Sequence, residues 1–569
     1  EQSEGFPKSK QRGAGGGGQP AMLLTNARVY TLDAQNGTAD SVVVRDGRIA
    51  FAGRRQEINP AAGEETLDLG GRVLLPGFVD SHAHLINLAR ATMSLDVAGV
   101  TSIEAIATSV AEAARERPRG VWIVGRGWDQ SLWPGGEFPT HHPLTAAAPE
   151  HPVCLTRVDG HAAWLNAAAM RAAGITRESE DPAGGRFLRD DGGEPTGVLI
   201  DLAQDSVRSI IPDPSEQETE AAIEQAIARC LSVGLVGVHE MGVGLETIDA
   251  YKRLIARGRF PFRNYVAVMG RSRTAWPYYR DRGPEVYAEG TGGRAPVRRG
   301  LGNPDGSPSP RIAVRAVKFM ADGALGSRGA AMHDPYADDP ANAGLMLMEP
   351  EEIERLTAEA AAAGFQPCIH AIGDRANTAV LDAFASVLAR YPGEDRRFRM
   401  EHAQILRPED ISRFRRLGVL PSMQQTHCTS DMRWVESRIG PERLEGAYAW
   451  RSLLDTGVVI PGGSDFPVEP PDPLYGVHAA VARRPRDGDQ PAWQPEQRMT
   501  RLEAIRSFTT WAAYAAFEED VAGSIEPGKR ADLVVLDDDP FTCDEQAIAA
   551  ISVTMTIVDG AVAYDAASV

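Results

Sequence analysis

The sequence predicts an α/β protein whose main part is a (β/α)8 TIM barrel, joined to a small β-sandwich formed from both chain ends. The chain has 569 residues, which is more than one ordinary compact domain needs. Its middle alternates short apolar runs with Ala-rich amphipathic stretches at 102–117, 216–234 and 350–364, a pattern typical of βα units around a parallel sheet. Both ends instead carry short apolar segments separated by turn residues, which is typical of β-hairpins.

The expected domain boundaries follow from this change of pattern. We expect residues 21–78 and 515–569 to pair into the β-sandwich, because SVVVRDGRIAFAG and SVTMTIVDGAVAY each place an Asp-Gly pair at a hairpin turn. Residues 79–514 are then left for the barrel. Residues 1–20, which include a run of glycines, are expected to form a flexible tail.

Two stretches of the middle fit no simple βα unit. Residues 120–214 are rich in Gly, Pro, Asp and Trp, and residues 290–310 are rich in Gly, Pro and Arg. We expect both to be loop insertions over the C-terminal face of the barrel, where barrel enzymes build specificity. Trp128, Trp133 and Trp434 are expected to form an aromatic rim at the barrel mouth, with hydrophobic packing under loops as the alternative.

Composition excludes several classes of protein. The net charge of −19 repels nucleic acid and anionic membranes, so we expect a small-molecule substrate and no nucleic-acid or membrane partner, with a homodimer left open. The five cysteines are odd in number and contain no CxxC pair, which argues against a disulfide framework or a thiolate zinc site.

The expected location is cytoplasmic, because no apolar run approaches the roughly 18 residues of a spanning helix. The chain begins at Glu1, so a signal peptide could have been removed, and a periplasmic or secreted location stays open.

The sharpest local signal is the segment LLPGFVDSHAHL at residues 74–85. Side chains alternate faces along a strand, so His82 and His84 project to the same side as Asp80. Two imidazoles at this spacing on a strand end can bind one metal ion. The preceding apolar strand and Pro-Gly turn favour a metal site over an incidental pair of histidines.

These residues resemble the first barrel strand of the amidohydrolase superfamily. Further segments resemble the superfamily in the same order: RAVKFMADGALGS with Lys318, QPCIHAIGDRAN with His370, RMEHAQ with His402 and VIPGGSDFPV with Asp465. Together with DGHAAWLN and QQTHC, they are similar to the subgroup called amidohydrolase family 3, typified by YtcJ-like proteins and N-substituted formamide deformylases. The resemblance spans Leu23 to Tyr564 and does not specify a substrate.

The resemblance implies a metal site made of His82, His84, Lys318, His370, His402 and Asp465. Imidazoles and carboxylates suit Zn²⁺, Mn²⁺, Fe²⁺ or Co²⁺, and we expect one or two Zn²⁺ ions per chain. The resemblance further implies that Lys318 is carboxylated by CO2 and bridges two metal ions. The alternative is an unmodified lysine that pairs with Asp322, which would leave a mononuclear site.

The expected activity is that of a metal-dependent amidohydrolase, a hydrolase acting on carbon–nitrogen bonds other than peptide bonds. A metal-activated hydroxide would attack a small amide, N-formyl or carbamate-like substrate, while Asp465 transfers the proton to the leaving nitrogen. His427 is expected to polarise the substrate carbonyl or bind the leaving group. His161 is expected either to contact the substrate or to cap its own loop.

Two alternatives to this activity remain. One is an aminoheterocycle or nucleobase deaminase, although many deaminases of the superfamily place Glu where this chain has Gly373. The other is a non-catalytic binding protein on the same fold, because fold alone does not prove activity.

Overall fold

The computed structural model describes residues 21–58, 65–158, 160–182, 184–288, 310–487 and 490–568, together with the short strand Ala295–Pro296. The tail expected at residues 1–20 lies outside the described residues, and so does nearly all of the insertion expected at 290–310. The chain divides into two compact units, of which one comprises Ile86–Ala226 and the other the remainder.

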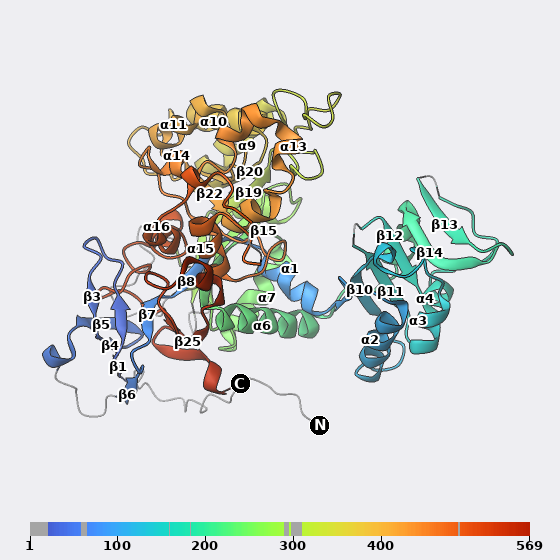
Figure 1. Ribbon diagram of the computed structural model, residues 1–569, viewed down its shortest axis with the longest axis horizontal. Coiled ribbons are helices and arrows are strands. Elements are labelled where there is room, and N and C mark those ends of the chain that lie inside the picture. Colours follow the sequence, from blue (N-terminus) through green and yellow to red (C-terminus); the bar gives the residue numbers. More distant parts are fainter. Residues whose placement is uncertain are drawn as a thin grey trace. The chain divides into compact units, whose positions relative to one another are not determined.

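The larger unit contains the barrel that the sequence predicts (Figure 1). Eight strands neighbour one another in chain order and pair in parallel. They are β8 (Phe78–Ala83), β15 (Leu235–Val243), β16 (Arg263–Met269), β19 (Pro310–Met320), β20 (Gln366–Ala371), β21 (Arg399–His402), β22 (Leu420–Gln424) and β23 (Gly462–Gly463).

The first and last strands meet and close the barrel. Asp465 N donates to His82 O at 2.8 Å, and His84 N donates to Phe466 O at 3.0 Å. The buried Asp80 carboxylate adds a side-chain link, because it accepts hydrogen bonds from Ser464 N at 3.0 Å and Ser464 Oγ at 2.6 Å. The closure therefore depends on side chains as well as on backbone pairing.

The helices that follow the strands form where the sequence predicts them. The predicted segments 216–234 and 350–364 are α6 (Glu216–Ser232) and α9 (Pro350–Ala362). Pro occupies the first turn of α9, where its missing N–H costs nothing, and two glutamates beside it suit the positive end of the helix dipole. The buried residues of α9, such as Ile353, Leu356 and Ala360, recur at helical spacing and form the face that packs onto the sheet.

Further helices of the larger unit lie between the barrel strands or after the last one (Figure 1). They are α7 (Leu245–Ala256), α8 (Ala275–Arg282), α10 (Asp374–Leu388), α11 (Pro408–Leu417), α12 (Gln425–Asp431), α13 (Val435–Ile439), α14 (Trp450–Leu454), α15 (Pro473–Ala482), α16 (Arg501–Ser507) and α17 (Thr510–Ala515). No helix in the described ranges combines the length and apolar character needed to cross a membrane.

Both chain ends contribute to the predicted β-sandwich. One sheet has the order β5 (Arg48–Gly53), β4 (Ser41–Arg45), β1 (Met22–Thr25) and β6 (Glu65–Asp68). The other has the order β26 (Ala561–Asp565), β25 (Val553–Val558), β24 (Leu533–Leu536), β7 (Val73–Pro76), β2 (Arg28–Tyr30) and β3 (Thr38–Ala39). Leu24, Leu74 and Ile557 belong to the shared apolar core. Asp46 and Asp559 adopt φ values of 51° and 50°, as tight hairpin turns require.

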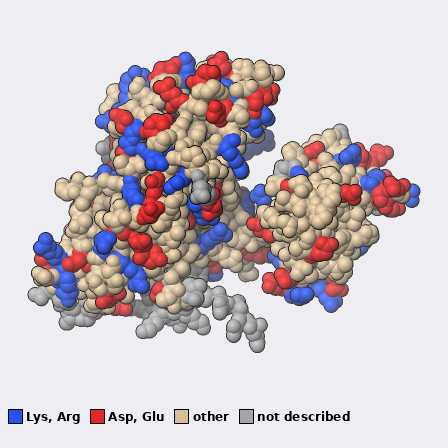
Figure 2. Space-filling model, viewed as in Figure 1, with Lys and Arg blue, Asp and Glu red and all other residues tan. Residues whose placement is uncertain are grey.

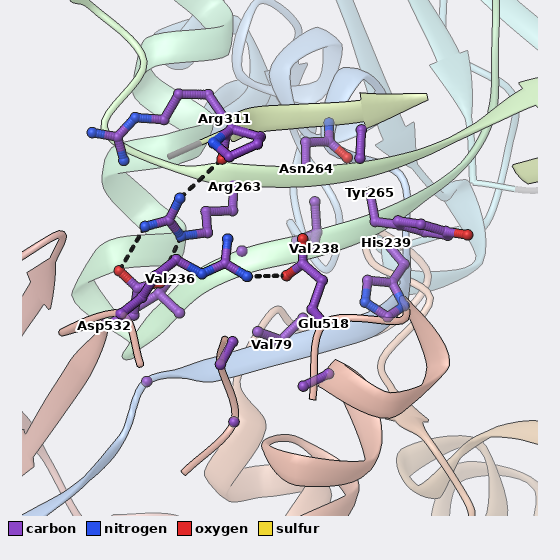
Figure 3. A pocket seen from close by; sticks show the side chains of 18 of the residues that line it. Val79, Val236, Val238, His239, Arg263, Asn264, Tyr265, Arg311, Glu518 and Asp532 are labelled. Atoms are coloured by element: carbon purple, nitrogen blue, oxygen red, sulfur yellow. Dashed lines mark hydrogen bonds and ion pairs between the residues drawn. The ribbon is translucent and has the colours of Figure 1, made fainter. Parts of the chain in front are cut away.

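An ion-pair network fastens the β-sandwich to the barrel (Figure 3). Arg263 of β16 lies 2.5 Å from an Asp532 oxygen through its Nε and also pairs with Asp559. Nη1 of Arg263 donates to Pro310 O at 2.9 Å. Arg263, Asp532 and Pro310 line a small pocket at the starts of the barrel strands, together with His239 and Tyr265.

The expectation of a loop insertion at 120–214 is wrong, because these residues belong to a folded unit with its own sheet. The order is β13 (Gly185–Arg189), β14 (Pro195–Asp201), β12 (Ala162–Leu165), β11 (Val153–Arg157), β10 (Ile123–Trp128) and β9 (Leu95–Asp96). The unit also contains α2 (Ile103–Arg115), the helix predicted at 102–117 but assigned there to the barrel, with α3 (His142–Ala147) and α4 (Ala167–Ala172). Its many glycines indicate loops when the sequence is considered alone. At least one of them is required inside a strand, because a Cβ on Gly125 of β10 would approach Leu95 O to 2.6 Å.

The aromatic rim is also corrected for two of its three tryptophans. Trp128 and Trp133 are buried in the core of the smaller unit, with ring centroids 5.9 Å apart and both near Trp164. Trp128 Nε1 donates to Leu155 O at 2.8 Å, which satisfies its polar atom. Packing, the alternative interpretation, is therefore correct for these two side chains.

Candidate metal centre

Two strand ends that close the barrel bring the first three candidate ligands together. His82 is the penultimate residue of β8, His84 directly follows that strand, and Asp465 lies two residues beyond β23. His84 Nε2 lies 3.1 Å from Asp465 Oδ1, and His82 Nε2 lies 3.5 Å from the same oxygen. One donor atom of each residue falls within 4.8 Å of the others, a spacing that could hold one metal ion.

The other three predicted ligands lie beside this group. Lys318 Nζ of β19 is 3.3 Å from His82 Nε2. The His402 ring of β21 has its centroid 4.7 Å from that of His82 and 4.5 Å from that of His370 in β20. The structure thus gathers all six side chains at the carboxyl ends of the strands, where barrel enzymes place their active sites.

His427 of α12 joins the same cluster. Its Nε2 lies 3.9 Å from Asp465 Oδ2, and its ring stacks on that of His402 at 6.0 Å with an interplanar angle of 11°. His402, His427 and Asp465 form a second group whose donor atoms could hold a metal ion. Two overlapping groups that share Asp465 are compatible with one ion or two.

The backbone is strained at two of the candidate ligands. His402 has φ of 77° and Asp465 has φ of 59°, in the left-handed region that non-glycine residues rarely adopt. Such conformations cost free energy and persist where the surroundings fix them, often at functional sites. At both positions the turn directs a side chain inward just as its strand ends.

The donor set fits a divalent transition metal ion. The two candidate groups combine the imidazoles of His82, His84, His402 and His427 with the Asp465 carboxylate, ligands that such ions accept. His427 Nε2 is buried without a hydrogen-bond partner in the described part of the chain. Buried polar atoms normally have a partner, so this nitrogen, 3.9 Å from the Asp465 carboxylate, supports ion binding there.

Comparison with known proteins agrees with this geometry. The sequence matches the amidohydrolase family over residues 65–564. The chain belongs to the amidohydrolase family. It is 33% identical over 546 residues to the YtcJ protein of Bacillus subtilis (strain 168), covering 94% of this chain and 98% of that protein.

Two further comparisons extend over nearly the whole chain. The amidohydrolase is 30% identical over 566 residues to the N-substituted formamide deformylase of Arthrobacter pascens, with 96% of this chain and 98% of that enzyme covered. A crystal structure of an uncharacterized metal-dependent hydrolase from Pyrococcus furiosus matches with a TM-score of 0.73 and 28% identity, covering 92% of this chain and 100% of that one. The resemblance drawn from the motifs is confirmed, and the chain is a metal-dependent hydrolase of carbon–nitrogen bonds.

Burial sets the charge states in the amidohydrolase site. It lowers the pKa of His82 to about 4 and that of His370 to about 3, and the nearby charge of Lys318 acts in the same direction. Both imidazoles are therefore neutral at pH 7, as metal ligands must be. Burial raises the pKa of Asp465, but the imidazoles of His82, His84 and His427 more than offset this and hold it below its usual range.

Each of three histidines is oriented by an acceptor on its other ring nitrogen. Glu401 Oε2 lies 2.7 Å from His82 Nδ1, Gln424 Oε1 lies 2.7 Å from His402 Nδ1, and Gly323 O lies 3.3 Å from His370 Nε2. Such partners fix the tautomer of a ligand. Sequence reasoning missed Glu401 and Gln424, although strand alternation could have placed both side chains inside the barrel.

The structure also locates the remaining predicted residues. Asp322 accepts hydrogen bonds from the backbone N–H groups of Ala331, Ile372 and Gly373, whereas Lys318 faces His82, so the geometry does not favour the alternative Lys318–Asp322 pair.

His161 lies in the smaller unit, where its exposed ring contacts Asp201 at 2.8 Å. Its role in substrate contact stays a prediction. Trp434, at the start of α13 in the larger unit, is partly exposed.

Proposed function

We propose that this amidohydrolase uses one or two Zn²⁺ ions to cleave the C–N bond of a small amide, N-formyl or carbamate-like substrate. The observation that carries the proposal is the convergence of six candidate ligands at the carboxyl ends of the barrel strands. A bound Zn²⁺ ion lowers the pKa of water toward about 7 and polarises a carbonyl. This chemistry suits an electrophilic carbon bonded to nitrogen.

Asp465 is the proposed acid/base. Its carboxylate is ionised at neutral pH and lies within 4 Å of three imidazoles, so it is placed to accept a proton from an attacking water. The same group would then return the proton to the leaving nitrogen. His427, which approaches Asp465 Oδ2 while His84 approaches Oδ1, is proposed to hold the substrate carbonyl or the leaving group.

Lys318 is proposed to react with CO2. Its burial lowers the pKa of the ammonium, which favours the neutral amine that forms a new N–C bond with CO2 and releases a proton. The product is a carbamate, an anionic oxygen donor at a position 3.3 Å from His82.

The mouth of the barrel favours a substrate with an apolar group. Met320 lies two residues beyond Lys318 on β19, so both side chains project to the same side of the strand. Met269 is its counterpart on β16, and the two are 46% and 47% exposed. In register, Met269 pairs with Lys318 and Met320 pairs with His370, which puts apolar surface beside the candidate ligands.

The charge distribution supports a small-molecule substrate. Figure 2 shows Lys and Arg side chains intermixed with Asp and Glu over the visible face rather than gathered into one basic patch. With a net charge of −19, such a surface disfavours a polyanionic partner. The relative that is named a formamide deformylase further supports an N-formyl amine as the substrate class.

A deaminase is the second candidate, and one observation weighs against it. A Cβ on Gly373 would lie 2.0 Å from the backbone oxygen of Ala331, so a Glu at this position would require the backbone to shift. The acidic residue that many deaminases place there does not fit this barrel.

A substrate screen tests the proposal. We expect metal-replete enzyme to hydrolyse N-benzyl or N-aryl formamides, amides or carbamates with a higher kcat/KM than dihydroorotate-like anions or nucleobases. The Asp465→Asn variant, assayed in parallel, controls for contaminating hydrolases. A preference for nucleobases or anions in the wild-type enzyme alone would reject the proposed substrate class.

A further inference from the structure

A column of buried polar side chains runs inside the barrel below His82. It consists of Glu401, Arg399, His239 and Ser422, all 2% exposed or less. A charged pair in a barrel interior is unusual, because removing both ions from water costs several kcal/mol and apolar side chains of similar volume would often be more stable. The column therefore calls for a role other than stability.

Hydrogen bonds and an ion pair connect the side chains of the column, from Glu401 through Arg399 to His239. Arg399 holds Glu401 through Nε at 2.9 Å from Oε1 and through Nη2 at 3.1 Å from Oε2. Its Nη1 donates to His239 Nδ1 at 2.9 Å, and its Nη2 also donates to Ser81 O at 2.6 Å and Ser422 Oγ at 3.0 Å. The guanidinium is thus fixed on several sides, and the carboxylate is fixed by the guanidinium.

The free end of the column meets the candidate metal centre. Glu401 Oε2 lies 2.7 Å from His82 Nδ1, while His82 Nε2 faces Lys318 at 3.3 Å and Asp465 at 3.5 Å. A carboxylate can only accept a hydrogen bond, so the imidazole must carry its hydrogen on Nδ1. Nε2 is then left with its lone pair toward the other ligands.

We infer that Glu401 is a positioning residue that fixes the His82 tautomer and strengthens Nε2 as a metal donor, and that Arg399 and His239 hold Glu401 for this task. The inference rests on the proposed metal site but not on the substrate. An anionic acceptor makes an imidazole a more basic ligand than a neutral acceptor does.

A contrast within the site supports this role. The neighbouring His402 ring has the same arrangement at Nδ1, but its acceptor is the neutral amide oxygen of Gln424 at 2.7 Å. Among the candidate ligands, all of which the structure describes, His82 alone has a carboxylate acceptor that a buried guanidinium holds. At the far end of the column, His239 lines the pocket at the starts of the strands (Figure 3), so the column crosses the barrel interior.

The test replaces the charge and keeps the shape. Glu401→Gln is compared with Glu240→Gln, which changes an equally buried carboxylate in β15 that hydrogen-bonds Tyr251 and Asn264. Zn²⁺ affinity is measured by competition with a chromophoric chelator, starting from metal-free protein. We expect Glu401→Gln to weaken binding by about 10- to 100-fold, the usual effect of losing such a partner.

The outcomes separate this inference from the proposed function. Glu240→Gln is expected to stay within about threefold of wild type, because its carboxylate hydrogen-bonds Tyr251 and Asn264, which are not candidate ligands. If wild type binds zinc and Glu401→Gln binds it equally well, or if both variants lose it equally, the inference is overturned. If wild-type protein binds no zinc, the proposed function itself fails.

A spectroscopic measurement reads the tautomer in the wild-type protein itself, and a variant serves only to assign the signal. ¹⁵N-histidine spectra of metal-free wild-type protein should show His82 as the Nδ1–H tautomer, with the signal assigned from its loss in His82→Gln. A His82 ring protonated on Nε2 instead would overturn the inference.

Discussion

Replacing Asp465 by asparagine separates the chemical role of this side chain from its part in closing the barrel. Asparagine tolerates the left-handed φ of 59° about as well as aspartate does, and the bond from residue 465 N to His82 O involves only backbone. The substitution therefore keeps the turn and the closure. It removes the charge that lies within 4 Å of the imidazoles of His82, His84 and His427.

We expect the loss to appear in turnover. A positioned acid/base contributes about 10²- to 10⁴-fold to a rate, which corresponds to about 2.7 to 5.4 kcal/mol of activation free energy. The assay is kcat on the best substrate of the screen, divided by the metal content of the same sample and accompanied by a thermal unfolding curve.

Metal content has to be measured because the amide is also a weaker ligand. A variant that holds normal metal, unfolds normally and loses at least a hundredfold in kcat would confirm the catalytic role. Turnover near that of wild type, with metal bound, would refute the reasoning and leave Asp465 as a structural residue only.

Three further predictions concern the ligands and the smaller unit. His82→Ala combined with His84→Ala should strip the metal, because two ligands are lost, and elemental analysis of the purified protein checks this. Lys318 should be carboxylated in metal-loaded crystals; electron density for an unmodified ammonium would contradict it, and one metal ion per chain would then be expected. Trp128→Ala should destabilise the smaller unit by about 3 to 5 kcal/mol, measured by denaturant unfolding, because its ring is fully buried there. An unchanged unfolding midpoint would show that this ring is not part of a core.

The sequence predicts the parts of the fold whose local pattern is unbroken. The Asp-Gly turns at 46 and 559 mark two hairpins of the β-sandwich, and period-two alternation brings His82 and His84 to one side of β8. Their partners Lys318, His370 and Asp465 follow apolar runs that become barrel strands or, for Asp465, the segment that closes the barrel. These signals are local, so a single sequence carries them.

The sequence does not predict the smaller unit, Ile86–Ala226, and the reason is physical. Gly125 and Gly127 interrupt the apolar pattern of β10 and look like loop residues. In the folded unit they are needed because neighbouring backbone approaches closely: a Cβ on Gly127 would lie 2.6 Å from Ala98 N. Such a requirement depends on segments distant in space, so it leaves no periodic signal. Glu401 is not predicted either, because its proposed role depends on its contacts with Arg399 and His82 and not on the pattern of its own segment.

The closing seam of the barrel has a consequence for how the enzyme is made. Asp80 and Ser464, whose hydrogen bonds join the first strand to the last, are separated by 384 residues. A growing polypeptide carries His82 and His84 early in its synthesis, but Asp465 emerges only after most of the chain has been translated. The full set of donors therefore exists only once the last strand has docked. Metal capture is in this way tied to completion of the fold, and a truncated or stalled chain offers the ion only a partial site.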